Sequence, residues 1–181
     1  MSTAFIDKSY SLGDSSSYLI RPIRLNDKER IIELFKHLSP ESRYLRFAHA
    51  ISKLPDDFLE NILHLDYVTE MALVAVIQNQ TGVEEIIGIA RYVTPPNQDI
   101  CEFSLSVSDS HTAHGIGTHL MRDLIAHAKE NTLQEMVGYV LSNNSKMLHL
   151  VSDLGFKTSK INDDPDFKIV SLPLREKTIN C

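Results

Sequence analysis

Hydrophobic patterns of two kinds follow one another along this chain. Alternating or continuous apolar runs predict strands over residues 18–25, 71–78, 84–94, 99–108, 136–141 and 167–174. Apolar residues spaced three and four apart predict helices over residues 27–38, 55–65, 115–130 and 144–153. Residues 41–50 alternate polar and aromatic side chains, which is typical of either a helical turn or a loop.

The order of these elements predicts an α+β fold. Three successive strands between residues 71 and 108 form antiparallel pairs, and Gly82 supplies the first turn. The helix over 115–130 then crosses to a strand parallel to the last of the three. We expect a mixed, mostly antiparallel sheet of six to seven strands flanked by about four helices.

Length and composition indicate one domain. The 181 residues are 43% hydrophobic, and no linker-like change in composition divides them. Residues 18–181 are expected to form a single domain, whereas residues 1–17 are either a leader or an extra edge strand.

Charge and cysteine content exclude several classes of protein. A net charge of −6, with scattered Lys and Arg, is unlike the basic stripe of a nucleic-acid-binding protein. No apolar run is long enough to span a membrane, and the first residues lack signal-peptide features. Cys101 and Cys181 give no disulfide framework. We therefore expect a cytoplasmic protein with no nucleic-acid or membrane partner, and its oligomeric state stays open.

The strand that ends near Val107 leads into a loop with Gly115 and Gly117 and then into an amphipathic helix. Such a loop leaves backbone N–H groups unpaired at the positive end of the helix dipole, which favours phosphate binding. The spacing fits neither a P-loop, which needs a Lys after the glycines, nor a dinucleotide fingerprint, because Leu120 takes the place of its third glycine.

These residues resemble the GNAT superfamily of N-acyltransferases. The family pattern is a strand, Gln/Arg-x-x-Gly-x-Gly/Ala, a helix, and later an Asn followed by Gly-Phe. Here it reads Leu105-Ser106-Val107, Thr112-Ala113-His114-Gly115-Ile116-Gly117, Asn144 and Gly155-Phe156. The stretches IRPIRLND, LSPESRYLRF and NNSKMLHLVSDLGF are more narrowly similar to the acyltransferase domain of bacterial protein-lysine acetyltransferases.

The resemblance implies transfer of an acetyl group from acetyl-CoA to an amine. Backbone N–H groups of residues 113–118, from Ala113 to Thr118, would hold the pyrophosphate. The pantetheine arm would pair with the backbone of Leu105, Ser106 and Val107 like an added strand. A backbone N–H of the same strand would stabilise the oxyanion, and Asn144 would contact the arm or simply cap its helix.

Two positions depart from the family pattern. Thr112 replaces the usual Gln or Arg, and His114 stands where a Lys is common, which would weaken rather than abolish phosphate binding. Val151 occupies a position where many GNAT enzymes carry a tyrosine as general acid. The protein-lysine acetyltransferase branch also lacks that tyrosine, so Val151 agrees with the narrower resemblance.

Glu102 is the candidate general base. A lysine amine with a pKa near 10.4 is mostly protonated at neutral pH, so a base assists its attack. Glu102 lies in an apolar strand, where partial desolvation would raise its pKa, or on the solvated face that it shares with Ser104 and Ser106. The resemblance favours the base, because the family carries its proposed base at the matching glutamate.

Other candidate residues carry less weight. In the segment SPESRYLRF, the side chains of Arg43, Tyr44, Arg46 and Phe47 either contact the acceptor or belong to a structural turn with Tyr44 and Phe47 in the core. His111, His114 and His119 lack metal-ligand periodicity, so we expect no metal.

Three readings of the function remain. The first is an N-acetyltransferase acting on a protein lysine or, alternatively, on a small amine such as a polyamine or aminoglycoside. The second is a non-catalytic acyl-CoA sensor, and the third is an interaction domain without a ligand.

Overall fold

The computed structural model describes residues 7–13, 16–48 and 50–175. The first six residues of the segment 1–17, predicted as a leader or an extra edge strand, lie outside the described residues, as does Cys181. The strands are β1 (Lys8–Ser11), β2 (Ser17–Pro22), β3 (Glu70–Gln78), β4 (Glu84–Val93), β5 (Ile100–Val107), β6 (Glu135–Leu141), β7 (Lys157–Ile161) and β8 (Asp164–Pro173). The helices are α1 (Lys28–His37), α2 (Pro40–Phe47), α3 (Asp56–Leu63), α4 (Ile116–Glu130) and α5 (Ser145–Asp153), with 3-10 turns at Leu25–Asp27 and Asp109–His114.

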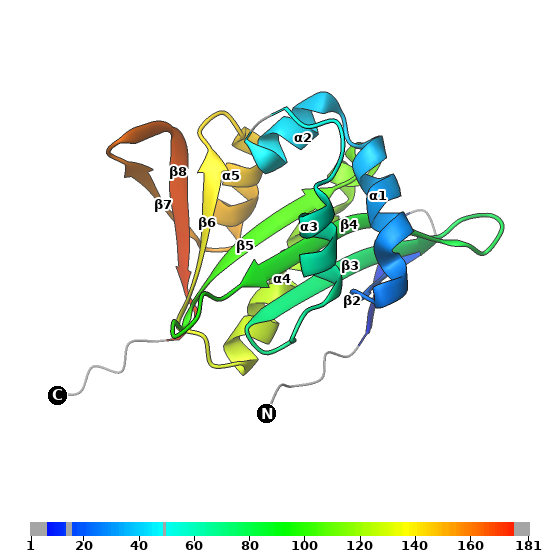
Figure 1. The fold of residues 1–181 in the computed structure, drawn as a ribbon, viewed down its shortest axis with the longest axis horizontal. Coiled ribbons are helices and arrows are strands. Elements are labelled where there is room, and N and C mark those ends of the chain that lie inside the picture. The colour runs from blue at the N-terminus through cyan, green and yellow to red at the C-terminus, as the bar shows by residue number, and fades with distance from the viewer. Residues whose placement is uncertain (1–6, 14–15, 49, 176–181) are drawn as a thin grey trace.

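All eight described strands form one sheet in the order β1-β2-β3-β4-β5-β6-β8-β7 (Figure 1). Within it, β5 and β6 are parallel and the other neighbours are antiparallel. This confirms the predicted α+β class and the mixed sheet. The helix α4 makes the predicted crossover between β5 and β6.

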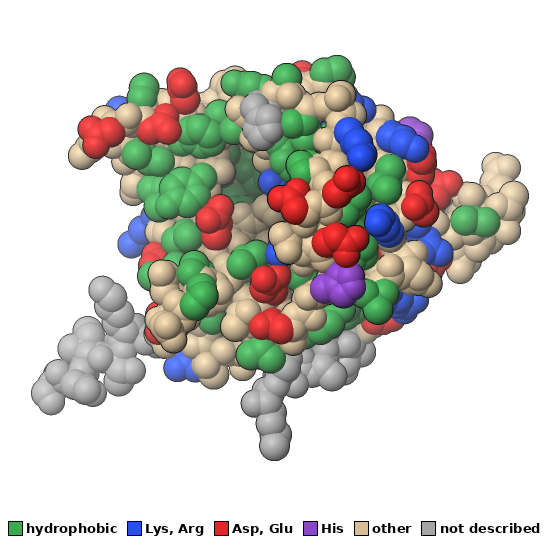
Figure 2. Space-filling model, in the orientation of Figure 1, with side chains coloured by type: hydrophobic (Ala, Val, Ile, Leu, Met, Phe, Trp, Pro, Cys, Tyr) green, Lys and Arg blue, Asp and Glu red, His purple; other side chains and the backbone are tan. Residues whose placement is uncertain are grey.

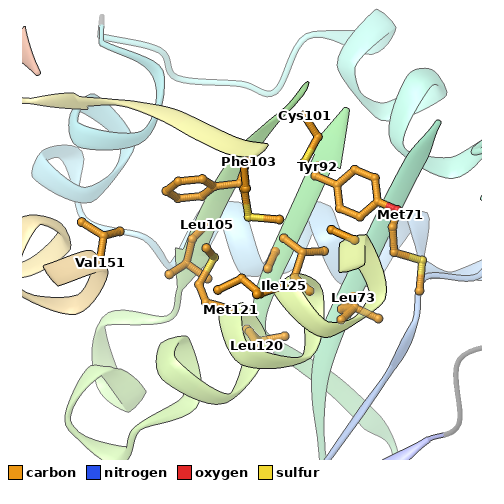
Figure 3. Packing of buried hydrophobic residues seen from close by; sticks show 14 of the residues in the cluster. Met71, Leu73, Tyr92, Cys101, Phe103, Leu105, Leu120, Met121, Ile125 and Val151 are labelled. Atoms are coloured by element: carbon orange, nitrogen blue, oxygen red, sulfur yellow. The ribbon is translucent and has the colours of Figure 1, made fainter. Parts of the chain in front are cut away.

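The two faces of the sheet carry separate hydrophobic clusters. Because strand side chains alternate, Met71, Leu73 and Ala75 of β3 join a cluster with α4, whereas Ala72 and Val74 join α1 and α3 on the other face. Figure 3 shows the first cluster, in which Leu120, Met121 and Ile125 of α4 meet strand side chains. The site is therefore built on a sheet that is covered on both faces.

The structure adds elements that the hydrophobic pattern did not specify. Residues 40–47 form α2, with Ser39 as N-cap and Pro40 in its first turn, which resolves the choice between helix and loop. The strand β7 escaped prediction because its sequence, KTSKI, is polar and its first four residues are exposed. It pairs with β8 alone, so no second neighbour requires apolar residues there.

The neighbouring strands β5 and β6 pair over a short stretch and then separate. Only Ile100–Glu102 are in register with Glu135–Val137. The next residue of β5 is Phe103, whose ring packs edge-on against Phe156 with ring centroids 5.3 Å apart. A Cβ at Gly138 of β6 would lie 2.4 Å from Cε1 of Phe103, so the ring occupies space that only glycine leaves open.

We predict that Gly138→Ala destabilises the fold by about 1–3 kcal/mol, because the added methyl group overlaps the Phe103 ring. Urea unfolding measures this loss. If the overlap is the cause, Phe103→Leu in the same chain recovers part of the loss in a double-mutant cycle. Additive effects of the two substitutions would contradict this explanation.

Candidate active site

A groove of about 850 Å³ opens where β5 and β6 diverge. Figure 2 shows a hollow on the face of the molecule that α1, α2 and α3 cover. The groove is lined from α2, β5, the start of α4, β6 and the N-terminal part of α5; it includes Arg46, Glu102, Leu105, Ser106, Val107, Thr112, Gly115, Gly117, Thr118, Tyr139 and Asn144. Most of the predicted site residues are therefore gathered in one groove.

The N-terminus of α4 presents free donors to this groove. Gly115 is the N-cap with φ 73°, in the left-handed region that favours glycine. The first bond of the helix runs from the His119 N–H to the Gly115 carbonyl at 3.0 Å. The N–H groups of Ile116, Gly117 and Thr118 consequently have no acceptor within α4, and they lie at the positive end of its dipole.

Gly117 lets α4 begin close to the sheet. A Cβ there would lie 3.0 Å from Cδ1 of Leu150 and 3.3 Å from Cδ2 of Leu105, tighter than most such contacts. The segment before the helix differs from the expected loop, because residues 109–114 form a 3-10 turn. Thr112 donates its hydroxyl to the Asp109 carbonyl at 3.2 Å, so it reinforces this turn. The N–H groups at the start of α4 that can bind phosphate therefore begin nearer to Gly115 than the predicted start at Ala113.

The C-terminal half of β5 pairs with a neighbouring strand on only one of its two edges among the described residues. Residues Glu102–Val107 pair with β4, while the described part of the chain gives residues 103–107 no strand partner on the β6 side. Backbone N–H and C=O groups along Leu105–Val107 can therefore pair with an extended ligand. This open edge of β5 suits the pantetheine arm of an acyl-CoA, and the N–H groups at the start of α4 suit its pyrophosphate.

Asn144 caps α5, and Val151 belongs to the core. The Asn144 side chain accepts a hydrogen bond from the Met147 N–H at 3.1 Å, so it has the structural role that we weighed against ligand contact. It also lines the groove, so the two roles are compatible. Val151 is fully buried in the cluster shown in Figure 3.

We predict that Asn144→Ala lowers the free energy of unfolding by about 1 kcal/mol, the usual cost of losing an N-cap acceptor. Asn144→Ser keeps a capping hydroxyl and should retain most of that stability. Thermal unfolding of both variants tests this, and an equal loss in the two would contradict capping as the role of this side chain.

Glu102 is exposed at the point where β5 leaves β6. Of the two predicted environments, the structure shows the solvated face, because strand alternation turns Glu102 away from the face on which Cys101 and Phe103 join the α4 cluster. It shares its face with Ser104 and Ser106, which are half-buried.

The predicted acceptor residues Arg43 and Tyr44 do not line the groove. The Arg43 guanidinium donates to the carbonyls of Leu38 at 3.1 Å and Lys36 at 2.9 Å, and it stacks on Phe35. It thus satisfies carbonyls at the end of α1. The next turn of the same helix provides Arg46, which does line the groove.

Asp109 ties α2 to the segment before α4. Its carboxylate accepts hydrogen bonds from the Ser39 N–H at 2.6 Å and from the Ser42 hydroxyl. Both donors belong to the start of α2, so the carboxylate also lies at the positive end of that helix.

Two of the three candidate histidines lie near each other, since the ring centroids of His111 and His114 are 6.3 Å apart. His119 stacks on Tyr10 with ring centroids 4.2 Å apart and shares a hydrogen bond with Tyr18. Burial raises the pKa of the Cys101 thiol to about 12, which makes it a poor nucleophile. Among the described residues, no group of three or more His, Cys, Asp and Glu side chains forms a metal-ligand cluster.

Sequence reasoning named Arg46 only as one of four possible acceptor contacts, and among the groove-lining residues that it missed are Tyr139 and Lys146. Arg46 stood in the noted segment SPESRYLRF, but a helix was needed to show which of its arginines faces inward. Tyr139 is 54% exposed on a strand that pattern alone marks as buried. Lys146 lies in the first turn of α5.

Comparison with known proteins agrees with this geometry. The model of the acetyltransferase (GNAT) family matches residues 31–156. An acetyltransferase of Pseudomonas aeruginosa is 32% identical over 154 residues, which cover 85% of this chain and 82% of that protein. The chain therefore belongs to the GNAT acetyltransferase family, whose members transfer an acetyl group from acetyl-CoA.

Solved structures show the same fold. The GNAT domain of S. lividans PAT superposes with a TM-score of 0.81 at 25% identity, covering 92% of this chain and 96% of that domain. The acetyltransferase yncA of Salmonella typhimurium, whose structure contains acetyl-CoA, gives 0.68 at 21% identity, covering 89% of this chain and 96% of that one. None of the described helices has the length and hydrophobicity needed to cross a membrane.

Proposed function

We propose that this acetyltransferase modifies a lysine side chain of a protein, with Glu102 as general base. The observation that carries the proposal is the position of Glu102: an exposed carboxylate in the groove, directly before the stretch of β5 that β6 leaves unpaired. Acetyl-CoA bound along that stretch would bring its thioester close to the carboxylate.

The chain's own groups would act as follows. The free N–H groups at the start of α4 bind the pyrophosphate, and the open edge of β5 holds the pantetheine arm. Glu102 takes a proton from the lysine ammonium, and the neutral amine attacks the thioester carbonyl. The C–S bond then breaks, the thiolate receives the second amine proton, and the amide remains. Val151 takes no part in this transfer, because it is apolar and buried.

Two observations favour a protein lysine over a free polyamine. Tyr139 lines the groove and is 54% exposed, so its ring can pack against a polypeptide segment. The sequence resemblance to the acyltransferase domain of protein-lysine acetyltransferases points the same way, as does the high structural similarity to the GNAT domain of S. lividans PAT.

Calorimetric titration with acetyl-CoA should give a dissociation constant in the micromolar range, despite Thr112. The reason is that backbone N–H groups, not the side chain at position 112, would supply most of the phosphate contacts. A titration with CoA alone serves as the parallel measurement. Absence of detectable heat from the folded protein at several temperatures would contradict the proposed donor site.

Replacing the proposed base should separate catalysis from binding. We predict that Glu102→Gln lowers kcat by about 100- to 10,000-fold, the usual contribution of a general base, while acetyl-CoA affinity stays the same. Release of CoA thiol measures turnover, and calorimetry measures binding. The matched control is Glu130→Gln, at the exposed end of α4, which should behave like the wild type.

A different outcome would identify a different function. Binding without turnover in the wild type, over a panel of lysine peptides and polyamines, would favour the acyl-CoA sensor. Equal turnover of wild type and Glu102→Gln would exclude Glu102 as the base.

A further inference from the structure

Among the described residues, no carboxylate forms a salt bridge with Arg46, which lines the groove. No ion pair or hydrogen bond joins its guanidinium to another group among the described residues. Instead, the guanidinium carbon lies 4.8 Å from the centroid of the Phe47 ring and 5.7 Å from that of Phe58. Charged groups that leave bulk water are normally paired, so an unpaired arginine held between two rings is available to a ligand.

The surroundings of Arg46 add positive charge. Arg91 of β4 lies close to it and is itself occupied, since its Nη2 donates to Glu70 at 2.7 Å. Burial and the charge of Arg91 lower the pKa of Arg46 to about 10, and the charge of Glu102 acts in the opposite direction. Arg46 therefore remains charged at neutral pH, and a bound anion would relieve the repulsion between the two arginines.

Two hydroxyl groups complete this place in the groove. Ser104 and Ser106 of β5 line both the groove and a small inner pocket of about 30 Å³ that Arg46 also lines. Neither hydroxyl makes a hydrogen bond among the described residues. The other residues that line this pocket are apolar except for Arg91, so Arg46, Ser104 and Ser106 are its uncommitted hydrogen-bond donors, and donors of these kinds suit a carboxylate.

The position of this pocket relates it to the acceptor. Glu102, Ser104 and Ser106 lie on the face of β5 that points toward α2, and Ser104 follows Glu102 by one strand repeat, about 7 Å. The helix α4, which offers the phosphate donors, packs on the opposite face of the sheet. A ligand group at Arg46 is thus beside the proposed base and on the side away from the CoA phosphates.

We propose that Arg46, Ser104 and Ser106 form a subsite for a carboxylate that the acceptor carries near its reacting amine. On a protein acceptor this carboxylate belongs to an acidic side chain beside the modified lysine. On a small acceptor it is the carboxylate of an amino acid. The proposal rests on the proposed function, because it places the amine at Glu102.

The test compares matched acceptors with wild type and Arg46→Met. One pair is a short blocked peptide containing Glu-Lys against the same peptide with Gln-Lys; the other is a free amino acid against its amide. In the wild type we expect the carboxylate-bearing member of one pair to have a KM lower by roughly 10- to 100-fold, as a charge-assisted contact provides. Arg46→Met should abolish this preference by raising the KM of the carboxylate-bearing member far more than that of the neutral member. The pair that responds identifies the source of the carboxylate.

Controls separate a local effect from damage to the fold. Arg46→Lys keeps the positive charge and should retain part of the preference for the carboxylate. If Arg46 had a purely structural role, its replacement would change the KM of charged and neutral acceptors alike. Arg122→Met, on the exposed side of α4, should match the wild type. Acetyl-CoA binding and thermal unfolding confirm that each variant is folded.

Three outcomes would overturn the subsite. The first is an equal KM for both members of both pairs in the wild type. The second is an equal loss for charged and neutral acceptors in Arg46→Met. The third is a preference for succinyl-CoA over acetyl-CoA that Arg46→Met removes, which would assign the pocket to the acyl group. Binding of the acetylated peptide products can also be measured in the presence of CoA. This measurement tests the carboxylate preference even if no acetyl transfer occurs. Failure of the subsite can therefore be told apart from failure of the proposed function.

Discussion

The separation of β5 from β6 is the constraint on which the groove depends. Parallel pairing stops after Glu102, and the Phe103 ring then fills the space beside Gly138 and meets Phe156. A sheet that continued its pairing would satisfy the backbone of residues 103–107 and leave no edge for a ligand. The Gly-Phe pair of the family pattern has a physical role here, because Gly155 adopts φ 89° after α5 and Phe156 supports the ring of Phe103.

Strand alternation then divides the groove into two sides. Leu105 packs with α4, near the helix N-terminus that offers free N–H groups, whereas Glu102, Ser104 and Ser106 face α2. One strand thereby presents backbone groups at its edge and a row of polar side chains on one face. This arrangement lets the donor and the acceptor reach the same few residues from opposite sides of the sheet.

The sequence predicted the parts of this structure that depend on local patterns. Period-2 runs located six strands, helical spacing located α1, α3, α4 and α5, and the glycines near residue 115 marked the start of α4. It did not predict β7, because the sequence of this strand is polar. The strand forms through its pairing with β8 alone. It also left Arg43 and Arg46 together as possible acceptor contacts, because periodicity within an uncertain segment could not show that Arg43 faces the end of α1 and Arg46 faces the groove. Side-chain direction of that kind follows from tertiary packing.

Asp109 links α2 to the 3-10 turn before α4 through hydrogen bonds. Its carboxylate holds the start of α2, which carries Arg46, while its carbonyl accepts from Thr112 in the 3-10 turn that leads to Gly115. A displacement of that turn on phosphate binding would therefore be transmitted to α2 through two hydrogen bonds at a helix N-terminus. Arg46 lies on the last turn of the same helix, beside the Phe47 and Phe58 rings, so one short helix joins the Asp109 contacts to Arg46 in the groove. The replacement of the usual Gln or Arg by Thr112 is consistent with this reading, since a short side chain that closes the turn favours rigidity over a direct phosphate contact.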